Sequence, residues 1–330
     1  MKTIALISGG LDSIVAAKLI QEQGVEVFYL NLKIPFCHKD RKGENKIARN
    51  YNIDLKTIDL SEEFLEIIRN PKHGYGSNMN PCIDCKILML RKAKDLLQEW
   101  GAQFIVTGEV LGQRPMSQHK RAMKLIEIDS GLEGLILRPL SAKLLDETIP
   151  EKLGWVDRNK LMDFGGRTRR PQMELAKKLG VESYPNAAGG CLLTDPEFSK
   201  RLKELIEQDE LNLANVELLK IGRHFRLRPK IKLAVGRNEK ENMELEKLAG
   251  ENDLLFFPPQ DLAGPTGLGR GEFSEELIQL SARIICRYCD LNDKIETDII
   301  YRKIGVVPRV ESSSLRASPI IESQLLSLRI

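Results

Sequence analysis

The sequence predicts an α/β protein with a doubly wound, mostly parallel sheet and a smaller α+β domain in its C-terminal part. Over residues 1–145, apolar runs alternate with amphipathic stretches, as in chains that alternate strands and helices. Near the N-terminus, a strand-like run breaks into two glycines and a helix-like stretch. From about residue 213 the chain becomes basic and rich in strand-like segments. We therefore expect three parts, covering residues 1–145, 146–212 and 213–330.

The first part should contain strands and helices in alternation. Ligands of such sheets bind at the carboxyl ends of the strands, where the first loop would also lie. The predicted strands are Ile4–Ile7, Val25–Leu32, Leu55–Leu60 and Phe104–Thr107, and the predicted helices are Ser13–Gln23, Glu44–Tyr51, Glu62–Ile68 and Cys85–Trp100.

The other two parts have a different character. Residues 146–212 form a linking subdomain in this prediction, with short helices broken by glycine pairs. Further on, the segment Leu218–Arg237 holds seven lysines or arginines and no acidic residue. After it we expect a helix at Glu239–Gly250, a strand at Leu254–Phe257, a glycine-rich turn at Gly264–Gly271 and a helix at Ser274–Cys289.

Composition places limits on the class of protein. The chain has 330 residues, 42% of them hydrophobic and 29% charged, and its formal net charge is only +3. No apolar stretch reaches membrane-spanning length, and the apolar N-terminus is too short for a signal peptide. We therefore expect a cytoplasmic protein without membrane contact. Six cysteines in a chain of this length do not indicate a disulfide scaffold.

A phosphate-binding loop is predicted between the first strand and the first helix, where the chain reads Ser8-Gly9-Gly10-Leu11-Asp12-Ser13. The glycines let the backbone turn sharply and bring bare N–H groups close to an anion. The helix that follows directs its positive end at the same point. Asp12 is suited to hold Mg²⁺ or to orient the loop. No lysine follows the glycines, so this is not the GxxxxGK[ST] loop of kinases and GTPases.

This hexapeptide resembles the signature of the ATP-pyrophosphatase (PP-loop) superfamily, whose fold is of the adenine nucleotide alpha hydrolase type. The resemblance implies that ATP is split between its α and β phosphates and that a substrate oxygen becomes adenylated. It implies ATP and Mg²⁺ as ligands and Asp12 as a catalytic residue. The implied nucleotide-binding residues are Ser8, Gly9, Gly10, Leu11, Asp12, Ser13, Thr107, Gly108 and Gln113.

Three cysteines form the second candidate constellation. Cys82 and Cys85 stand at the start of a predicted helix, whose positive end would favour a thiolate, and Cys191 follows two glycines about a hundred residues later. Asn80-Pro81-x-x-Cys85 resembles an element of bacterial tRNA 2-thiouridylases, and Thr107-Gly108-Glu109 resembles their TGH element with glutamate in place of histidine. The resemblance implies that Cys85 and Cys191 are the catalytic pair and that the substrate is tRNA.

Cys82 departs from the simplest thiouridylase pattern, and two sulfur-transfer mechanisms therefore stay open. A CxxC pair with one distant cysteine resembles the cysteine pattern of the iron–sulfur-dependent tRNA thiolation enzymes. In those enzymes three thiolates hold a [4Fe–4S] cluster, and the fourth iron has a free coordination site. This would make Cys82, Cys85 and Cys191 metal ligands. Alternatively, one cysteine carries a persulfide and its partner resolves it as a disulfide. Because Cys82 has no role in the persulfide mechanism, we favour the cluster mechanism. The sulfur donor would be sulfide or a persulfide carrier.

Arginines in three segments are candidates for contact with tRNA phosphates. One segment follows the predicted strand that ends at Thr107, a second is flanked by Gly165 and Gly166, and a third lies at the start of the basic region. The basic region, with Gly222-Arg223-His224-Phe225 and Gly264-Pro265-Thr266, resembles the NFACT-type RNA-binding domain. His73, His119 and His224 are expected at the surface or facing RNA. The candidate RNA-binding residues are Arg114, Arg167, Arg169, Arg170, Arg223, Arg226 and Arg228.

These features together predict an ATP-dependent tRNA sulfurtransferase that forms 2- or 4-thiouridine. The first alternative is a small-molecule adenylating ligase or amidotransferase of the same superfamily, which would need neither three thiols nor a basic domain. The second is a non-catalytic RNA-binding protein, which the intact phosphate loop argues against. Cys286 and Cys289 share a helical face and are expected in a core rather than at a zinc site. The identity of the uridine and the oligomeric state, including a homodimer, stay open.

Overall fold

The computed structural model describes residues 1–36, 49–184, 191–292, 294–305 and 312–330. The chain forms two compact units, Met1–Asp195 and Pro196–Ile330. Residues 146–195 of the expected linking subdomain thus fall in the first unit, and residues 196–212 fall in the second. Most of the predicted helix at 44–51, together with Cys37, Gly189 and Gly190, lies outside the described residues.

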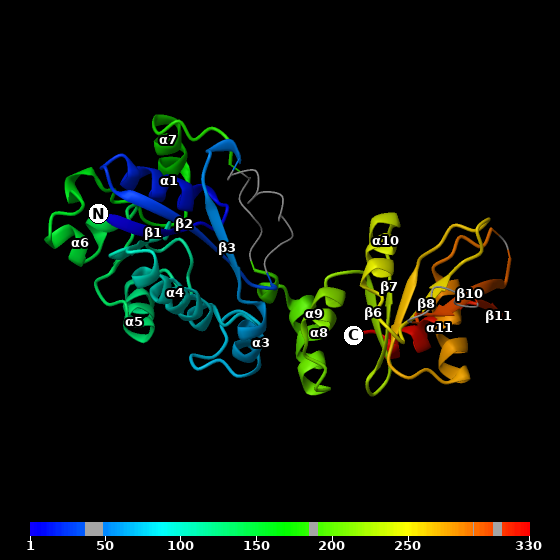
Figure 1. The fold of residues 1–330 in the computed structure, drawn as a ribbon. Coiled ribbons are helices and arrows are strands. Elements are labelled where there is room, and N and C mark those ends of the chain that lie inside the picture. The colour runs from blue at the N-terminus through cyan, green and yellow to red at the C-terminus, as the bar shows by residue number, and fades with distance from the viewer. Residues whose placement is uncertain (37–48, 185–190, 293, 306–311) are drawn as a thin grey trace. The chain divides into compact units, whose positions relative to one another are not determined.

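The first unit is built on a five-stranded sheet in which every pair of neighbours is parallel, in the order β3-β2-β1-β4-β5 (Figure 1). This confirms the predicted doubly wound sheet. Its elements are β1 (Lys2–Leu6), α1 (Leu11–Gln21), β2 (Glu26–Lys33), β3 (Leu55–Asp59), α3 (Ser61–Arg69), α4 (Cys82–Glu99), β4 (Phe104–Val106), α5 (Lys120–Ser130), β5 (Ile136–Leu137), α6 (Ile149–Lys152) and α7 (Arg170–Lys178), with 3-10 turns at Ala142–Leu144, Arg158–Lys160 and Leu192–Thr194.

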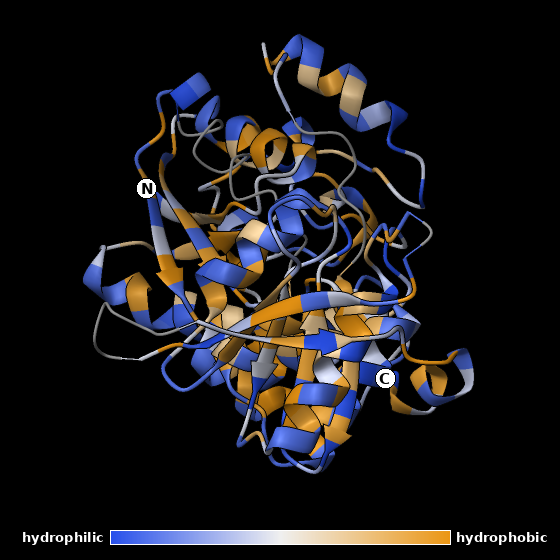
Figure 2. Cartoon of the chain, turned by 90° about the vertical axis from the view of Figure 1, so that its right-hand side faces the viewer, coloured by the Kyte–Doolittle hydropathy of each residue, from blue (hydrophilic) through white to orange (hydrophobic). Residues whose placement is uncertain are grey.

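Helices cover both faces of this sheet because successive strand side chains point to opposite sides. Ala5 and Ile7 pack in one core cluster with the buried side of α1, whereas Ile4 and Leu30 pack in another with α4. Figure 2 shows helices in which hydrophilic and hydrophobic residues alternate, as amphipathic covering helices require. The strand order reverses between β1 and β4, and a ligand site is expected outside the carboxyl ends at that point.

The second unit contains a six-stranded antiparallel sheet in the order β11-β10-β8-β9-β7-β6. The α+β class expected for the C-terminal part is therefore confirmed. Its elements are α8 (Pro196–Glu207), α9 (Leu213–Leu219), β6 (Arg223–Arg228), β7 (Ile231–Val235), α10 (Glu239–Leu248), β8 (Leu254–Phe257), β9 (Gly267–Arg270), α11 (Glu275–Arg287), β10 (Thr297–Lys303), β11 (Ser313–Ala317) and α12 (Glu322–Leu328).

The glycine-rich segment predicted as a turn is instead a central strand, β9, between β7 and β8. A Cβ atom on Gly267 would lie 2.5 Å from Ile285, and one on Gly269 would lie 2.6 Å from Phe273. The glycines therefore make room for side chains that cover the sheet. This close packing, rather than turn formation, accounts for the glycines.

Cys286 and Cys289 lie where α11 meets this sheet. Cys286 is fully buried, and the Cys289 thiol donates to the carbonyl of Ile285 at 3.4 Å. Burial raises the pKa of Cys289 to about 12, which keeps it an unreactive thiol. The prediction of a core position is confirmed, although α11 ends at Arg287 and Cys289 follows it. None of the helices that the structure describes combines the length and apolar character needed to cross a membrane.

Candidate functional site

The loop between β1 and α1 has the geometry of an anion cradle. Gly9 has φ +81°, a conformation that favours glycine, and Gly10 caps α1 without any side-chain hydrogen bond to the first turn. The hydroxyl of Ser13 donates to the carbonyl of Gly10 at 2.8 Å and accepts from the amide of Ser8 at 3.3 Å. These bonds close the loop and leave first-turn N–H groups of an eleven-residue helix available for an anion.

Asp12 supplies an oxygen suited to a divalent cation. Its Oδ2 accepts from the Gln113 side-chain amide at 3.1 Å, whereas its Oδ1 is buried and has no hydrogen-bond partner among the residues that the structure describes. Mg²⁺ prefers carboxylate oxygens and phosphate oxygens together. The unsatisfied Oδ1 beside the anion cradle therefore fits the predicted Mg²⁺. Gln113, expected near the nucleotide, does reach the loop.

Gly108 brings the carboxyl end of β4 directly onto the loop. A Cβ atom on this residue would lie 2.4 Å from the amide nitrogen of Ser13 and 2.6 Å from the carbonyl oxygen of Asp12. Backbone cannot move aside as a flexible side chain can, so only glycine fits here. The preceding residue, Thr107, is buried, and its amide donates to Leu137 at 3.0 Å.

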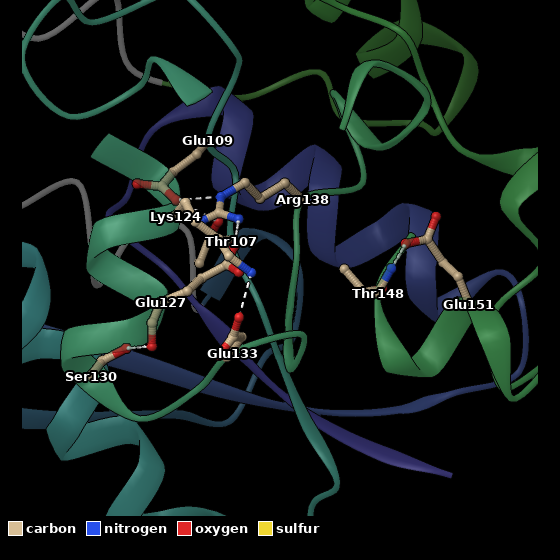
Figure 3. Close-up of polar contacts among 9 residues, drawn as sticks. All are labelled: Thr107, Glu109, Lys124, Glu127, Ser130, Glu133, Arg138, Thr148 and Glu151. Atoms are coloured by element: carbon tan, nitrogen blue, oxygen red, sulfur yellow. Dashed lines mark hydrogen bonds and ion pairs between the residues drawn. The ribbon is translucent and has the colours of Figure 1, made fainter. Parts of the chain in front are cut away.

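A buried network of charges continues from Gly108. Glu109 is 4% exposed and lies between the ammonium of Lys86, at 3.1 Å, and the guanidinium of Arg138, at 3.0 Å. Arg138 also pairs with Glu127, and Figure 3 shows its guanidinium beside both carboxylates. Burial raises the pKa of Glu109, but the charges of Lys86 and Arg138 outweigh it and lower the pKa to about 2. Glu109 is therefore ionised at neutral pH.

This network connects the phosphate loop to the cysteine helix. Lys86 follows Cys85 in α4, and the helix begins at Cys82, three residues earlier than predicted. The Cys82 thiol donates to the hydroxyl of Ser117 at 3.2 Å, in the loop that follows β4. Both cysteines of the CxxC pair thus lie in the first turns of α4, and Cys82 is held there by Ser117.

Cys191 belongs to the same unit, and a chain of contacts leads from it toward α4. The Cys191 thiol lies 3.6 Å from the carbonyl oxygen of Phe36. The carbonyl of Thr194, three residues on, accepts from the side chain of Asn78 at 2.8 Å. Asn78 in turn stands just before the start of α4. Within the described part of the chain, however, no three cysteine, histidine or acidic side chains are grouped to hold a metal ion. The [4Fe–4S] cluster therefore stays a prediction.

Two basic loops of the first unit contact each other. The amide of Gly166 donates to the carbonyl of Leu111 at 2.7 Å, which joins the arginine loop to the loop that carries Gln113. Arg114 and Arg167 are exposed. Arg169 is half-buried at the start of α7, and Arg170 is exposed and pairs with Glu174 at 2.9 Å. Arg114 and Arg167 therefore lie on two joined loops, one of which reaches the phosphate loop through Gln113.

The arginines of β6 differ in their exposure. Arg228 is exposed, and Arg223 lies over the ring of Tyr288 at 4.6 Å. Arg226 is instead largely buried and pairs with both Glu204 and Glu210 at 2.6 Å. The Arg226 guanidinium, which we expected to contact RNA, is thus engaged in two ion pairs within the second unit.

The expectation that the histidines lie at the surface fails for His224. His224 is 1% exposed, and burial together with the charges of Arg201 and Lys232 lowers its pKa to about 3. His119 is exposed and caps α5 through its Nδ1 atom, whereas His73 is half-buried against Asp129 at 2.9 Å.

Two residues of this site carried no sequence signal that we used. Lys86 is one of many surface-type lysines, and its partner Glu109 lies 23 positions away. Asn31 is a buried amide inside β2, with 3% exposure. Asparagine is depleted in strands, and this feature could have singled it out.

Comparison with known proteins finds two family models that match separate parts of the chain. Residues 1–149 match the sequence model of the family described as thiamine biosynthesis protein (ThiI). Residues 222–325 match the family described as NFACT protein RNA binding domain. The chain thus carries a ThiI-type PP-loop domain followed by an NFACT-type RNA-binding domain, and both resemblances inferred from the sequence are confirmed.

The relatives of the chain include enzymes named for tRNA thiolation. A tRNA-specific 2-thiouridylase MnmA of Petrotoga mobilis is 23% identical, with 96% of this chain and 89% of the relative covered. A probable tRNA sulfurtransferase of Thermococcus kodakarensis is 33% identical, with 42% of this chain and 36% of the relative covered. A solved 4-thiouridine synthetase–RNA complex with bound ATP shares 21% identity over 65% of this chain and 52% of that chain, with a TM-score of 0.42.

Proposed function

Because a ThiI-type domain is joined to an NFACT-type RNA-binding domain in this chain, we propose that the protein is an ATP-dependent tRNA sulfurtransferase. It activates a uridine carbonyl oxygen as an adenylate and replaces it with sulfur. ATP, Mg²⁺, tRNA and a sulfur donor are the ligands of this reaction.

The observation that carries the proposal is a short path from the phosphate loop to the cysteines. Gly108 packs on the backbone of Asp12 and Ser13, and the next residue, Glu109, binds Lys86 of the cysteine helix at 3.1 Å. A nucleotide α-phosphorus on the loop and a sulfur at the start of α4 therefore lie on one scaffold. An adenylating ligase that uses no sulfur would not need this connection.

The first chemical step forms the adenylate. The uridine carbonyl oxygen attacks the α-phosphorus of ATP, a new P–O bond forms and pyrophosphate leaves. The N–H groups at the start of α1 stabilise the negative charge that spreads over the phosphate oxygens. Mg²⁺, held by Asp12, supplies further charge neutralisation when it is bound.

The second step introduces sulfur. We place a persulfide on one of Cys85 and Cys191, charged by a persulfide carrier. Its terminal sulfur attacks the adenylated carbon, and AMP leaves with the former carbonyl oxygen. The thiolate of the other cysteine attacks the inner sulfur, which releases thiouridine and leaves a disulfide for a thiol reductant to reduce. Cys82 stays outside this sequence, held by Ser117.

Mass spectrometry of tRNA nucleosides tests the proposal. Purified protein, ATP, Mg²⁺, a persulfide donor and unmodified tRNA should yield one thionucleoside together with pyrophosphate. Iron analysis after anaerobic purification tests the sulfur route. About four irons per chain would indicate that a [4Fe–4S] cluster, and not a cysteine persulfide, delivers the sulfur.

Asp12→Ala should abolish pyrophosphate release, because Asp12 is the only acidic residue between Ser8 and Ser13, a loop that the structure describes in full. Asp163→Ala, on an exposed loop of the same unit, is the matched control and should leave release unchanged. Undiminished pyrophosphate release by Asp12→Ala would contradict the assignment of the nucleotide site. Pyrophosphate release without any thionucleoside would favour an adenylating ligase.

A further inference from the structure

The turn that begins at Cys191 is closed by its own hydrogen bonds. The carbonyl oxygen of Cys191 accepts from the amide of Thr194 at 2.9 Å and from its hydroxyl at 2.7 Å. Between these two residues, Leu193 is fully buried. The backbone of Cys191 therefore moves together with Thr194, and a contact that holds Thr194 also places Cys191.

Two hydrogen bonds on different sides hold this turn in the first unit. The amide of Leu192 donates to the carbonyl of Phe36, beyond the end of β2, at 3.1 Å. The side-chain Nδ2 group of Asn78, just before α4, donates to the carbonyl of Thr194 at 2.8 Å. One of these bonds alone would let the turn swing, whereas the two together also fix its orientation. Of the two, only the bond from Asn78 comes from a side chain.

Asn78 lies in a loop segment that is itself closed. The amide of Gly76 donates to the carbonyl of Asn80 at 2.9 Å, and the amide of Asn80 donates to the carbonyl of Ser77 at 3.3 Å. The φ angle of Asn78 is +56°, in the left-handed region that asparagine and glycine adopt more readily than other residues. A glycine at this position would therefore keep the backbone conformation and remove only the side chain.

This loop segment leads directly into the cysteine helix. After Asn80 comes Pro81, whose carbonyl accepts from the amide of Cys85 at 2.9 Å in the first turn of α4. The Asn78 side chain thus joins the turn of Cys191 to the segment that begins the cysteine helix. A link between two segments raises the effective concentration of their reactive groups at each other.

We propose that Asn78 is a positioning residue for sulfur transfer, which holds the turn of Cys191 at the start of α4 and so favours the disulfide between Cys85 and Cys191; this rests on the persulfide route of the proposed function. The disulfide and the bond from Asn78 join the same two segments, so each makes the other more favourable. Removal of the bond should therefore make the disulfide easier to reduce.

Equilibration of the full chain with mixtures of glutathione and glutathione disulfide measures this effect without ATP or tRNA. Glutathione disulfide takes two electrons and two protons from the thiols of Cys85 and Cys191, which gives the protein disulfide and two molecules of glutathione. Peptide mass spectrometry quantifies the oxidised fraction. In Asn78→Gly the equilibrium constant for disulfide formation should fall about fivefold, as for the loss of one hydrogen bond, which raises the reduction potential by about 20 mV.

A second variant removes the bond without adding a glycine. Asn78→Asp keeps the size of the side chain, but a carboxylate only accepts and cannot donate to the carbonyl of Thr194. Its reduction potential should rise at least as much as that of Asn78→Gly. Asn78 is exposed, so neither change disturbs the core of the first unit.

Asn52→Gly is the matched control. Asn52 has a φ angle of +48° and is exposed in the same unit, and within the described part of the chain its side chain has no hydrogen-bond partner. The variant makes the same change in a similar backbone conformation and should keep the wild-type potential. An equal rise in Asn52→Gly and Asn78→Gly would overturn the proposal, because a general effect of glycine would then account for both.

The remaining outcomes separate this proposal from the proposed function. If the wild-type protein forms the disulfide between Cys85 and Cys191 but both Asn78 variants keep its potential, only the role of Asn78 fails. If Cys191 pairs with Cys82 instead, or if the wild-type protein forms no disulfide of Cys191 at any ratio of the two glutathione forms, the persulfide route fails together with the role of Asn78.

Discussion

At the scale of single residues, Glu109 shows how one buried charge can organise a site. It follows the glycine that contacts the phosphate loop, and it holds both Lys86 of α4 and Arg138 at the end of β5. Removing one member of a buried ionic group usually costs more than the group contributes, because its partners stay buried and unpaired. The effects on stability of substituting Lys86, Glu109, Glu127 and Arg138 should therefore not be additive.

Glu109→Gln should lower the free energy of unfolding of the first unit by about 3–5 kcal/mol at pH 7, because Arg138 and Lys86 lose their common carboxylate. Urea denaturation followed by circular dichroism measures the loss. Glu174→Gln is the matched control, because it breaks an exposed pair with Arg170 and should cost less than about 1 kcal/mol. Equal losses in both variants would refute the role of Glu109.

The pH dependence of stability gives a second readout for Glu109. Its pKa lies near 2 in the folded protein, against an ordinary value of 4.5. The folded state thus binds this proton less readily than the unfolded state, and the stabilisation is complete above pH 4.5. It should be lost as the pH falls from 4.5 toward 2, and Glu109→Gln should lack this part of the acid transition.

Local geometry that depends on neighbouring residues was predictable, and contacts that depend on distant partners were not. The loop from Ser8 to Ser13 carries its glycines, hydroxyls and carboxylate within one hexapeptide, so its geometry follows from neighbouring residues. Arg226 looked like an RNA contact because its own neighbours are basic. Its partners Glu204 and Glu210 come from another part of the second unit, and only the fold brings them together.

At the scale of elements, β1 and β4 were predictable because strands buried on both faces are continuous apolar runs. The predicted strand Leu55–Leu60 and the observed β3 differ by one residue. The beginning of α4 was less certain from the sequence, since Pro81 permits a helix to begin directly after it. β9 was missed because its glycines serve the packing of Ile285 and Phe273, which is a property of the sheet and not of the segment.

Gly267→Ala should destabilise the second unit by about 1–3 kcal/mol, as overpacking of a filled core does. The new Cβ would lie 2.5 Å from Ile285, a fully buried side chain with little freedom to move. Thermal denaturation monitored by circular dichroism measures the effect. Gly250→Ala provides the comparison, because its Cβ would meet nothing nearer than 3.7 Å. No difference between the two variants would argue against close packing at β9.

At the scale of the whole molecule, the distribution of charge matters more than its sum. A net charge of +3 on 330 residues indicates no partner, yet two exposed arginines of the first unit, Arg114 and Arg167, lie on two loops in mutual contact. The change to a basic segment near residue 218 is visible in composition along the chain. The joining of the two loops was not predictable, because Leu111 and Gly166 are 55 positions apart.

RNA binding by the full chain should weaken steeply with salt, because each phosphate contact releases counterions. Arg114 and Arg167 are exposed on the joined loops, so the double variant Arg114→Gln, Arg167→Gln should reduce the slope of log affinity against log salt by about two. Filter binding of tRNA from low to moderate salt measures this slope. Arg226→Gln is the internal control: since Glu204 and Glu210 occupy this guanidinium, the variant should lower stability and keep the slope. The opposite pattern, with the slope changed only by Arg226→Gln, would move the RNA contact from the joined loops to β6.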